Sequence, residues 1–311
     1  MAVFGAGAVG AVYGLHLQRG GAEIVFVVRQ KYVDEVRAGI RMYRGSRDHT
    51  GELLVAEQVV GDVEELRGQA LDQVWLCVPS TSIDEATLQK IASATGDALI
   101  VDMAPGLDGR SLRIFGRARL VDGLIPFISY QTPLPGVPAE ADRDGIAYWL
   151  PPLTPTALSG PGAAEAASAL VAGGMTARAV KDVESGRAVG SALLMGVIAT
   201  LEVSGWDLKR ARARLDGAVG QAVDAMARAN HVRGTLVKLV AQPAIARMVL
   251  WLAPVVVPLP LERYLAYHFT KVGAQTRAML KSYLDAADKA GLAAPELREI
   301  TRQIEALPPR S

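Results

Sequence analysis

Short apolar runs alternate with longer amphipathic stretches along the first 125 residues of the chain. The runs are rich in β-branched side chains and are bounded by glycine, proline or charged residues, which is typical of strands. Helices are expected in the intervals, so the pattern predicts a parallel sheet with helices on both faces. The predicted strands are residues 2–4, 24–28, 74–78, 99–102 and 119–123.

Proline and glycine become frequent between residues 125 and 160. We expect a further strand at residues 146–150 and then a helix in the alanine-rich run 161–173. Residues 126–136 are predicted as a loop, in which Tyr130 and Gln131 are candidates to close over a ligand. The alternative is a loop that only connects its neighbours.

Beyond residue 181 the pattern changes to long helical segments with no strand between them. The frequent alanines in these segments suggest closely packed helices. The change marks a domain boundary, so we predict an α/β domain at residues 1–179 and an all-helical domain at residues 180–311. The predicted helices are residues 185–203, 208–230, 261–290 and 294–307.

The composition excludes several classes of protein. Hydrophobic residues make up 50% of the 311 positions and charged residues 21%, which excludes a disordered chain. The net charge of +1 provides no general attraction to nucleic acid or to an anionic membrane. We therefore expect a small-molecule substrate and no nucleic-acid partner.

The single cysteine, Cys77, cannot form an internal disulfide, and the four histidines show no zinc-ligand spacing. No metal site is expected, and Cys77 is predicted to be a small core residue because no base lies beside it in the sequence. With no signal-peptide pattern at the start, we expect a cytoplasmic protein.

Residues 248–261 form an uncharged apolar run that contains three prolines. A helix needs roughly 20 apolar residues to cross a bilayer, so we expect no membrane span here. The run is predicted to be a buried or subunit-facing loop, and residues 240–261 are a candidate homodimer surface.

The strongest motif is a glycine turn directly after the first predicted strand. Gly5, Gly7 and Gly10 have the G-x-G-x-x-G spacing and precede a helix. Gly5 permits the tight turn, Gly7 lets the backbone approach a pyrophosphate, and Gly10 lets helix and strand pack closely. Ala8 and Val9 are expected to offer backbone amides to the same phosphates. The fold class is therefore α/β, with an N-terminal Rossmann-type parallel sheet and an all-helical C-terminal domain.

The end of the second strand indicates which dinucleotide is bound. An acidic residue there would favour NAD, but the strand ends Val27-Val28-Arg29. An arginine can hold the 2′-phosphate of NADP through two hydrogen bonds, so we predict NADP(H), with Lys31 adding positive charge. The alternative is a solvated Arg29 that binds nothing.

The next two strand ends are expected to line the same crevice. Val78 and Pro79 follow the third strand, and their backbone is predicted to contact the adenosine or the nicotinamide ribose. Pro105, in the turn after the fourth strand, is the comparable candidate for contact with nicotinamide.

The glycine turn, the arginine-ended second strand and the helical second half ending in AGLAAPELREI resemble the ketopantoate reductase family. The resemblance covers nearly the whole chain. It implies a 2-dehydropantoate 2-reductase-like enzyme that reduces a 2-keto acid with NADPH, with a substrate cleft between a Rossmann domain and a helical domain.

Several functional positions of that family differ in this chain. The matching stretch for the family's lysine helix is GSALLMGVIATLEV, where the lysine's place falls near Gly190 or Ser191. The family's late glutamate aligns with Arg277, and its Asn-Gly turn becomes Pro105-Gly106. Glu202 is the only ionisable residue of residues 191–203. It is either a buried functional carboxylate or, as we expect, the first exposed residue at the helix end.

Polar groups in residues 264–276 could replace the missing lysine. Tyr264, Tyr267, His268 and Lys271 recur at intervals of three and four, so a helix would place them on one face. The run at residues 269–273 is similar to one in divergent relatives of the family. Lys271 is our first catalytic candidate, as a cation or proton donor, with His268 or Tyr267 next. Equally, Lys271 and His268 could be exposed helix residues and the tyrosines core.

Three functions remain open at this point. The leading hypothesis is an NADP(H)-dependent reductase that transfers hydride to a carbonyl or imine carbon of a small substrate. The alternative is an NADP(H)-binding sensor or partner-docking protein without catalysis. A third hypothesis is a peripheral membrane enzyme that uses residues 248–261 as its anchor.

Overall fold

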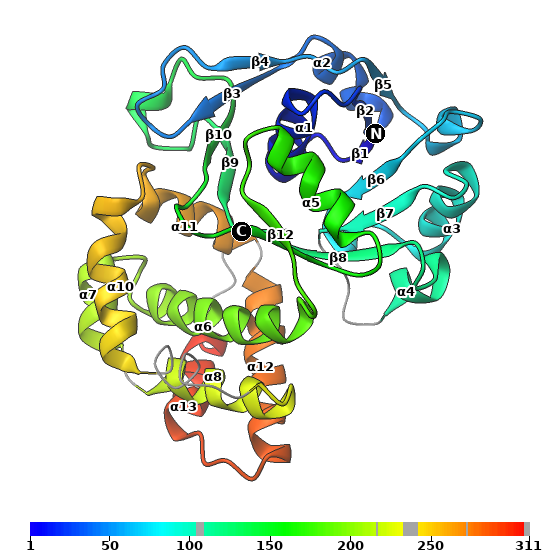
Figure 1. Ribbon diagram of the computed structural model, residues 1–311. Coiled ribbons are helices and arrows are strands. Elements are labelled where there is room, and N and C mark those ends of the chain that lie inside the picture. The colour runs from blue at the N-terminus through cyan, green and yellow to red at the C-terminus, as the bar shows by residue number, and fades with distance from the viewer. Residues whose placement is uncertain (104–108, 216, 233–241, 272, 308–311) are drawn as a thin grey trace. The chain divides into compact units, whose positions relative to one another are not determined.

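The computed structural model describes residues 1–103, 109–215, 217–232, 242–271 and 273–307 (Figure 1). The chain forms two compact units. Unit 1 comprises Met1–Pro133 and Ala139–Val183, and unit 2 comprises Leu134–Pro138 and the chain from Glu184 onward.

Unit 1 is built on an eight-stranded sheet with the order β12-β11-β8-β7-β6-β1-β2-β5. The six strands from β5 to β8 in this order are parallel, whereas β11 runs antiparallel to β8. This confirms the predicted α/β class with a parallel sheet. The strands are β1 (Ala2–Phe4), β2 (Val25–Val27), β5 (Gln58–Val60), β6 (Gln73–Leu76), β7 (Leu99–Asp102), β8 (Leu120–Leu124), β11 (Thr156–Ser159) and β12 (Ala177–Ala179).

Both faces of this sheet are buried, which is why its strands read as uninterrupted apolar runs in the sequence. Side chains alternate along each strand: Phe26 belongs to one core, while Val25 and Val27 belong to the other. The first core includes α1 (Ala8–Arg19) and α5 (Ala163–Ala172), and the second includes α3 (Glu85–Ala94) and the end of α4 (Arg110–Phe115).

A second sheet packs on the α1 side with the order β4-β3-β10-β9. Its strands are β3 (Ile40–Arg44), β4 (Glu52–Leu54), β9 (Ile128–Thr132) and β10 (Gly145–Trp149). Only β10 was expected. The predicted loop at residues 126–136 was wrong, because its centre forms β9 by pairing with β10. Tyr130 is buried there and donates from its hydroxyl to Glu140 at 2.6 Å, so its side chain does not close over a ligand.

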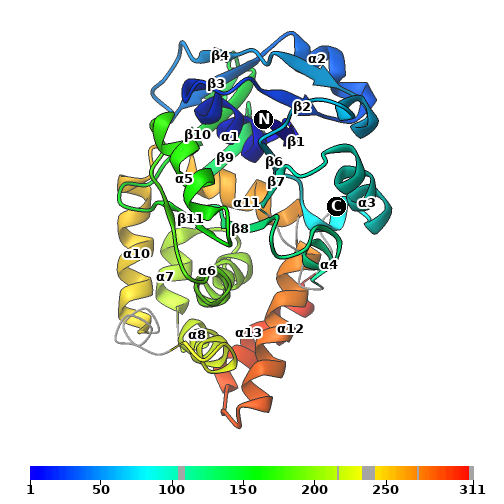
Figure 2. The same ribbon diagram turned by 45° about the vertical axis from the view of Figure 1, so that its right-hand side comes forward.

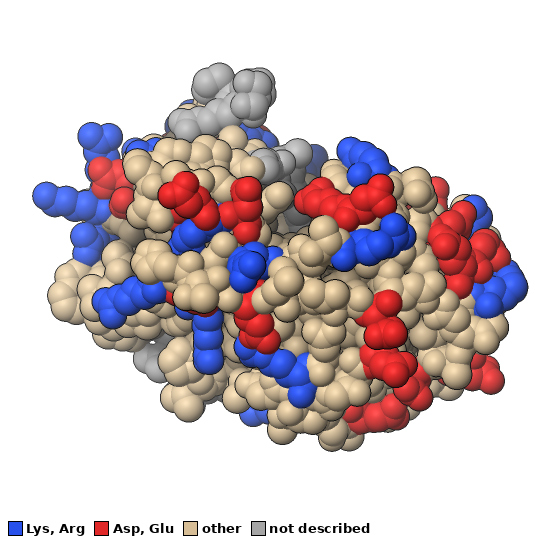
Figure 3. All heavy atoms as spheres, turned by 90° about the horizontal axis from the view of Figure 1, so that it is seen from above, with Lys and Arg blue, Asp and Glu red and all other residues tan. Residues whose placement is uncertain are grey.

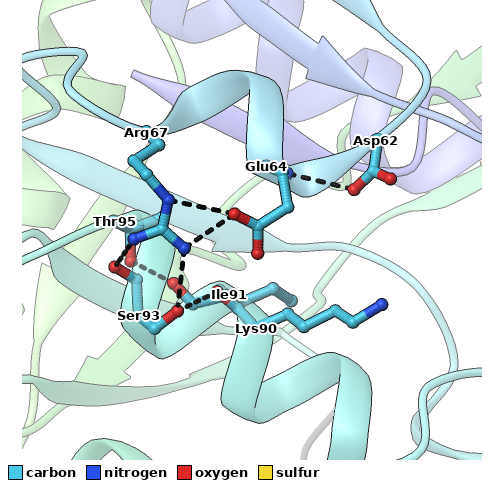
Figure 4. Close-up of polar contacts among 7 residues, drawn as sticks. All are labelled: Asp62, Glu64, Arg67, Lys90, Ile91, Ser93 and Thr95. Atoms are coloured by element: carbon cyan, nitrogen blue, oxygen red, sulfur yellow. Dashed lines mark hydrogen bonds and ion pairs between the residues drawn. The ribbon is translucent and has the colours of Figure 1, made fainter.

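Short 3-10 turns connect several strands of unit 1: η1 (Gln30–Tyr32), η2 (Val63–Leu66), η3 (Ser80–Ser82) and η4 (Pro138–Glu140). The helix α2 (Val33–Arg37) follows η1. Figure 4 shows how η2 is held against α3: Arg67 donates to Glu64 at 2.6 Å and to the Ser93 hydroxyl at 3.3 Å. These groups are partly exposed, so the ion pair itself adds little to stability.

Apart from Leu134–Pro138, the described part of unit 2 consists of helices and the turns between them. The helices are α6 (Glu184–Val203), α7 (Leu208–Arg214), α8 (Ala218–Ala229), α10 (Pro243–Val256), α11 (Leu261–Lys271), α12 (Gly273–Lys289) and α13 (Pro295–Glu305). The helix α6 packs against α8, α12 and α13 (Figures 1 and 2). Gly196 permits a close approach, because a Cβ there would lie 3.1 Å from the Cα of Val219.

Two predictions for this half were wrong in detail. Residues 208–230 form two helices, α7 and α8, rather than one. The predicted helix at residues 261–290 is described as α11 and α12, and residue 272 between them lies outside the described residues. Residues 248–256 belong to the helix α10 instead of a loop. The prolines misled that prediction. Pro243 occupies the first turn, where its missing N–H costs nothing, whereas Pro254 lies inside the helix near its end and removes one intrahelical hydrogen bond without ending the helix.

The helix α6 is long and apolar enough to cross a membrane by length and composition alone. Core helices of soluble proteins pass the same test, and 44% of its apolar window is buried inside the structure. Together, α10 and α11 would also pass, but they are bent by 113°. The α6 helix and the bent α10–α11 pair are therefore only weak evidence for a membrane-spanning helix.

Charged side chains of both signs are interspersed over the face seen in Figure 3, with uncharged areas between them. This distribution agrees with the net charge of +1. On that face, the described residues form no broad surface of one sign that would attract a polyanion.

The burial of His16 predicts a pH-dependent stability. Its Nδ1 lies 2.8 Å from the Gly173 carbonyl oxygen, and its Nε2 has no hydrogen-bond partner among the described residues. Burial lowers the pKa of His16 below the usual 6.5, with Arg19 and Arg44 contributing in the same direction. Protonation therefore favours the unfolded chain, which takes up the proton first as the pH falls.

We expect the free energy of unfolding to decrease as the pH drops below about 6.5, by at most about 1.4 kcal/mol per pH unit. Urea unfolding at several pH values measures this slope. His16→Asn should flatten it, whereas His49→Asn, at an exposed position, should leave it unchanged. If His16→Asn shows the same slope as the wild-type protein, His16 is not the group that makes the stability depend on pH.

Candidate functional site

The strand order of the main sheet reverses at β1, which has β2 on one side and β6 on the other. In open α/β sheets, ligands bind outside the carboxyl ends of the strands at such a point. Backbone hydrogen bonds join the three strand ends here: Gly5 N–H donates to Val27 O at 2.9 Å, and Cys77 N–H donates to Phe4 O at 3.1 Å. These bonds hold the turn after β1 to the ends of β2 and β6.

The glycine turn has the backbone geometry that its sequence predicts. Gly5 has a φ of +88°, and a Cβ on it would lie 2.4 Å from a methyl carbon of Val78. A Cβ on Gly10 would lie only 1.8 Å from the carbonyl oxygen of Gly5. These two glycines are required so that α1 and the end of β6 can approach the turn after β1.

Gly7 differs from the other two glycines because it faces open space. It is exposed, and a Cβ on it would have no described atom within 4 Å. Gly7 is also the N-cap of α1, where it supplies no side chain to accept from the first amides. The N–H groups around Ala8 and Val9 lack intrahelical acceptors and lie at the positive end of the helix dipole. This arrangement is suited to an anion such as a pyrophosphate.

Arg29 lies at the carboxyl end of β2 with its side chain exposed. Its guanidinium donates to the Tyr32 hydroxyl at 3.4 Å and lies 5.1 Å from the centre of the Tyr32 ring. The ammonium of Lys31 lies 4.8 Å from the centre of the same ring. Tyr32 therefore holds two cations beside the crevice. Sequence reasoning missed Tyr32, although its spacing of three from Arg29 in a helical turn was a usable signal.

The end of β6 forms another wall of this crevice. Val78 is half-buried against Gly5, and Pro79 is exposed at the start of η3. Arg110, which the sequence did not single out, fixes this turn by donating to the carbonyl of Ser80 at 2.9 Å. The candidate Pro105 lies outside the described residues.

Cys77 packs against the first core and is not suited to act as a nucleophile. Burial raises the pKa of its thiol, and the carboxylate of Asp102 acts in the same direction. Asp102 is buried at the end of β7, where it accepts a hydrogen bond from the Ser111 hydroxyl at 2.6 Å. Within the described chain, no group of three or more His, Cys, Asp or Glu side chains could hold a metal ion.

In unit 2, Tyr264, Tyr267, His268 and Lys271 all lie on α11. Tyr264 and His268 share a face, because their rings stack with centres 5.5 Å apart. Tyr264 is buried, which raises its pKa to about 12, whereas His268 is exposed and Tyr267 half-buried. Lys271 is the last residue of α11, and its side chain lies outside the described part.

The expectation of an exposed Glu202 was wrong. The side chain is buried, and its Oε1 accepts a hydrogen bond from Arg277 at 3.1 Å. The end of α6 is not at the surface because α12 and α13 pack against it. Arg277 also donates to the carbonyl oxygens of Gly273 and Ile304, so it ties three helices together. The other oxygen of Glu202 has no hydrogen-bond partner among the residues that the structure describes.

Comparison with known proteins agrees with this fold. The family model for ketopantoate reductase PanE/ApbA matches residues 1–129. A PanE/ApbA family ketopantoate reductase from Ralstonia eutropha is 18% identical, with a TM-score of 0.68 over 98% of this chain and 97% of that chain. The 2-dehydropantoate 2-reductase from Porphyromonas gingivalis is 16% identical, with a TM-score of 0.68 over 98% of both chains.

A further similar structure is the ternary complex of D-mandelate dehydrogenase with NADH and anilino(oxo)acetate. It is 16% identical, with a TM-score of 0.67 over 98% of this chain and 97% of that chain. No curated protein matches the sequence significantly. At these identities the structures establish the fold. The resemblance to the ketopantoate reductase family is confirmed, and the low sequence identities are those of a divergent chain.

The glycine turn generates a prediction for stability. Gly10→Ala should reduce the free energy of unfolding by about 3 kcal/mol or more, because its Cβ would collide with backbone that cannot move aside. Gly7→Ala is the matched control and should cost only about 1 kcal/mol or less, because its Cβ meets no described atom and alanine is only a poorer N-cap than glycine. Urea unfolding of both variants measures the difference. Equal stabilities would show that α1 does not approach the turn as closely as described.

Proposed function

We propose that the protein is an NADP(H)-dependent oxidoreductase that reduces a carbonyl or imine carbon of a small substrate. The observation that carries this proposal is the open amide end of α1 at the strand reversal, next to the pair of cations on Tyr32. A family model for ketopantoate reductases covering residues 1–129 supports the reaction class. We place the protein in the cytoplasm, in keeping with its single thiol.

The residues present fit a dinucleotide with an added phosphate. The exposed Gly7 leaves room for the pyrophosphate, and the amides at Ala8 and Val9 would hold its charge. Arg29 would bind the 2′-phosphate through its planar guanidinium, with Lys31 adding a second positive charge. The turn at Val78 and Pro79 would contact the sugar. When bound, this cofactor supplies the hydride and the protein supplies orientation.

The protein must also polarise the substrate carbonyl and deliver a proton to it. We propose Lys271 for this role, because an ammonium group can bind a substrate carboxylate or protonate a developing alkoxide. His268, exposed on the same helix, is the second candidate. Tyr267 is the third. Tyr264 is a poor proton donor, since burial raises its pKa to about 12.

One observation favours the alternative of an NADP(H)-binding protein without catalysis. The position that aligns with the family's late glutamate carries Arg277, and this side chain is engaged by Glu202. A group held in this way is less able to bind a substrate. The two functions differ in one result: a sensor would bind NADPH but would not oxidise it with any substrate.

We expect the protein to bind NADPH more tightly than NADH, and Arg29→Ala to weaken NADPH binding by about 10- to 100-fold. NADH binding should change little, because NADH lacks the phosphate. Tyr32→Phe should have a smaller effect, since the ring is kept and only the hydroxyl is lost. Fluorescence titration of the wild type and each variant with NADPH and with NADH measures these affinities. Arg37→Ala, at an exposed arginine on α2, is the control. If the wild-type protein binds neither dinucleotide, the proposed function fails.

Lys271→Ala should lower turnover by about 100-fold or more, the usual contribution of a positioned proton donor, and leave NADPH affinity unchanged. Loss of NADPH absorbance with a panel of 2-keto acids and imines measures turnover. Lys281→Ala, an exposed lysine on α12, should behave as wild type. Unchanged turnover in Lys271→Ala would remove this residue from the mechanism. NADPH binding without turnover on any substrate would favour the sensor.

A further inference from the structure

The helix α10 carries its apolar stripe on the outside of unit 2. Its exposed apolar side chains follow the spacing i, i+1, i+3, i+4, i+7, i+8, which is one continuous face of a helix. Trp251 is 62% exposed and Val255 83%. Only Ala246 and Leu250 of this helix are buried, on a narrower face. The exposed set is Met248, Val249, Trp251, Leu252, Val255 and Val256.

A core helix has the opposite arrangement, with its wide apolar stripe turned inward. Single exposed apolar residues are common, but a continuous stripe marks a surface that another phase or molecule covers. The proposed reductase activity gives no reason for this stripe.

A cationic helix lies beside this stripe. The helix α7 packs against α10, and Figures 1 and 2 show the two neighbours in unit 2. α7 has the sequence LKRARAR, with four cations and no acidic residue. Arg247 adds an exposed cation on α10 itself, and residues 242–261 contain no acidic residue.

The two acidic residues at the edges of this region are already engaged. Asp207 caps α7 by accepting from the Arg210 amide at 2.8 Å, and its carboxylate lies 3.5 Å from the Arg210 guanidinium. Glu262 accepts from the Leu208 amide at 3.1 Å. The surface therefore combines an apolar stripe containing a tryptophan with a net positive border.

We propose that the surface formed by α7 and α10 docks on an anionic lipid bilayer. Helices that lie in the bilayer interface bury an apolar face at the level of the headgroups, and nearby lysines and arginines bind anionic lipids. Trp251 is well suited to the interface, where tryptophan is enriched. The contact is peripheral, because the 14 residues of α10 are too few to span a bilayer.

A second copy of the chain fits the same surface less well. A stable protein interface usually involves about 20 to 30 residues from each partner, whereas α10 offers six exposed apolar side chains. A twofold contact would also bring the cations of the two copies together, and like charges repel. A bilayer with anionic headgroups has the complementary charge.

Sedimentation of the full chain with large vesicles tests this proposal. We expect binding to phosphatidylcholine vesicles containing 30 mol% phosphatidylglycerol, an anionic fraction of roughly the size that attracts basic surfaces, and little binding to pure phosphatidylcholine. Binding should weaken as salt is raised. Trp251→Glu/Val255→Glu should weaken it by roughly 30-fold or more. Lys209→Gln/Arg212→Gln should weaken it by about 30-fold, or roughly fivefold for each cation.

Leu153→Glu is the matched control, because it removes a fully exposed apolar side chain in unit 1 and should bind vesicles as wild type does. Circular dichroism and NADPH titration establish that each variant is folded, independently of the vesicle result. Absence of binding to anionic vesicles would overturn the proposal. So would a wild-type dimer, measured by light scattering, that Trp251→Glu/Val255→Glu converts to a monomer.

Discussion

The candidate site of unit 1 depends on one contact that only glycine permits, between Gly10 in the first turn of α1 and the carbonyl of Gly5. The separation of 1.8 Å for a hypothetical Cβ means that the helix rests directly on the backbone of the turn. This contact aims the amide end of α1 at the carboxyl ends of the strands. The end of β6 also approaches this turn closely, with Val78 against Gly5.

The charges around that crevice explain which ligands it suits. The first turn of α1 has no acidic residue, and β2 ends in an arginine rather than in the acidic residue that would repel a phosphate. Tyr32 holds the guanidinium of Arg29 in place. Under the proposed function, an Arg29 held in this way would lose less side-chain freedom on binding a phosphorylated ribose. The glycine turn and the basic cluster therefore support the same ligand class through independent features.

Wholly or partly buried ion pairs connect separate elements within each unit. In unit 1, Glu140 accepts from the hydroxyls of Tyr130 and Thr132, and Arg143 donates to the Gly45 carbonyl at 2.9 Å. In unit 2, Glu202 and Arg277 connect α6 to α12. Such pairs add little net stability, but removing one partner leaves an uncompensated charge in the interior. These pairs fix which elements lie next to one another.

Local patterns of the sequence determined five strands of the main sheet (β1, β2, β6, β7 and β8), the glycine turn and the arginine that follows β2, whereas β5, β11 and β12 were not predicted. Each predicted feature depends on residues within a few positions of one another, through side-chain alternation and backbone sterics. The sequence could not show that residues 128–132 form a strand, because this strand exists only by pairing with β10. The sequence also could not show that Glu202 is buried or that the apolar stripe of α10 is exposed. The burial of these side chains depends on which helices pack against α6 and α10. Whether a side chain is buried depends on which elements pack against it. Only the tertiary structure brings those elements together, so the sequence alone does not show which side chains they cover.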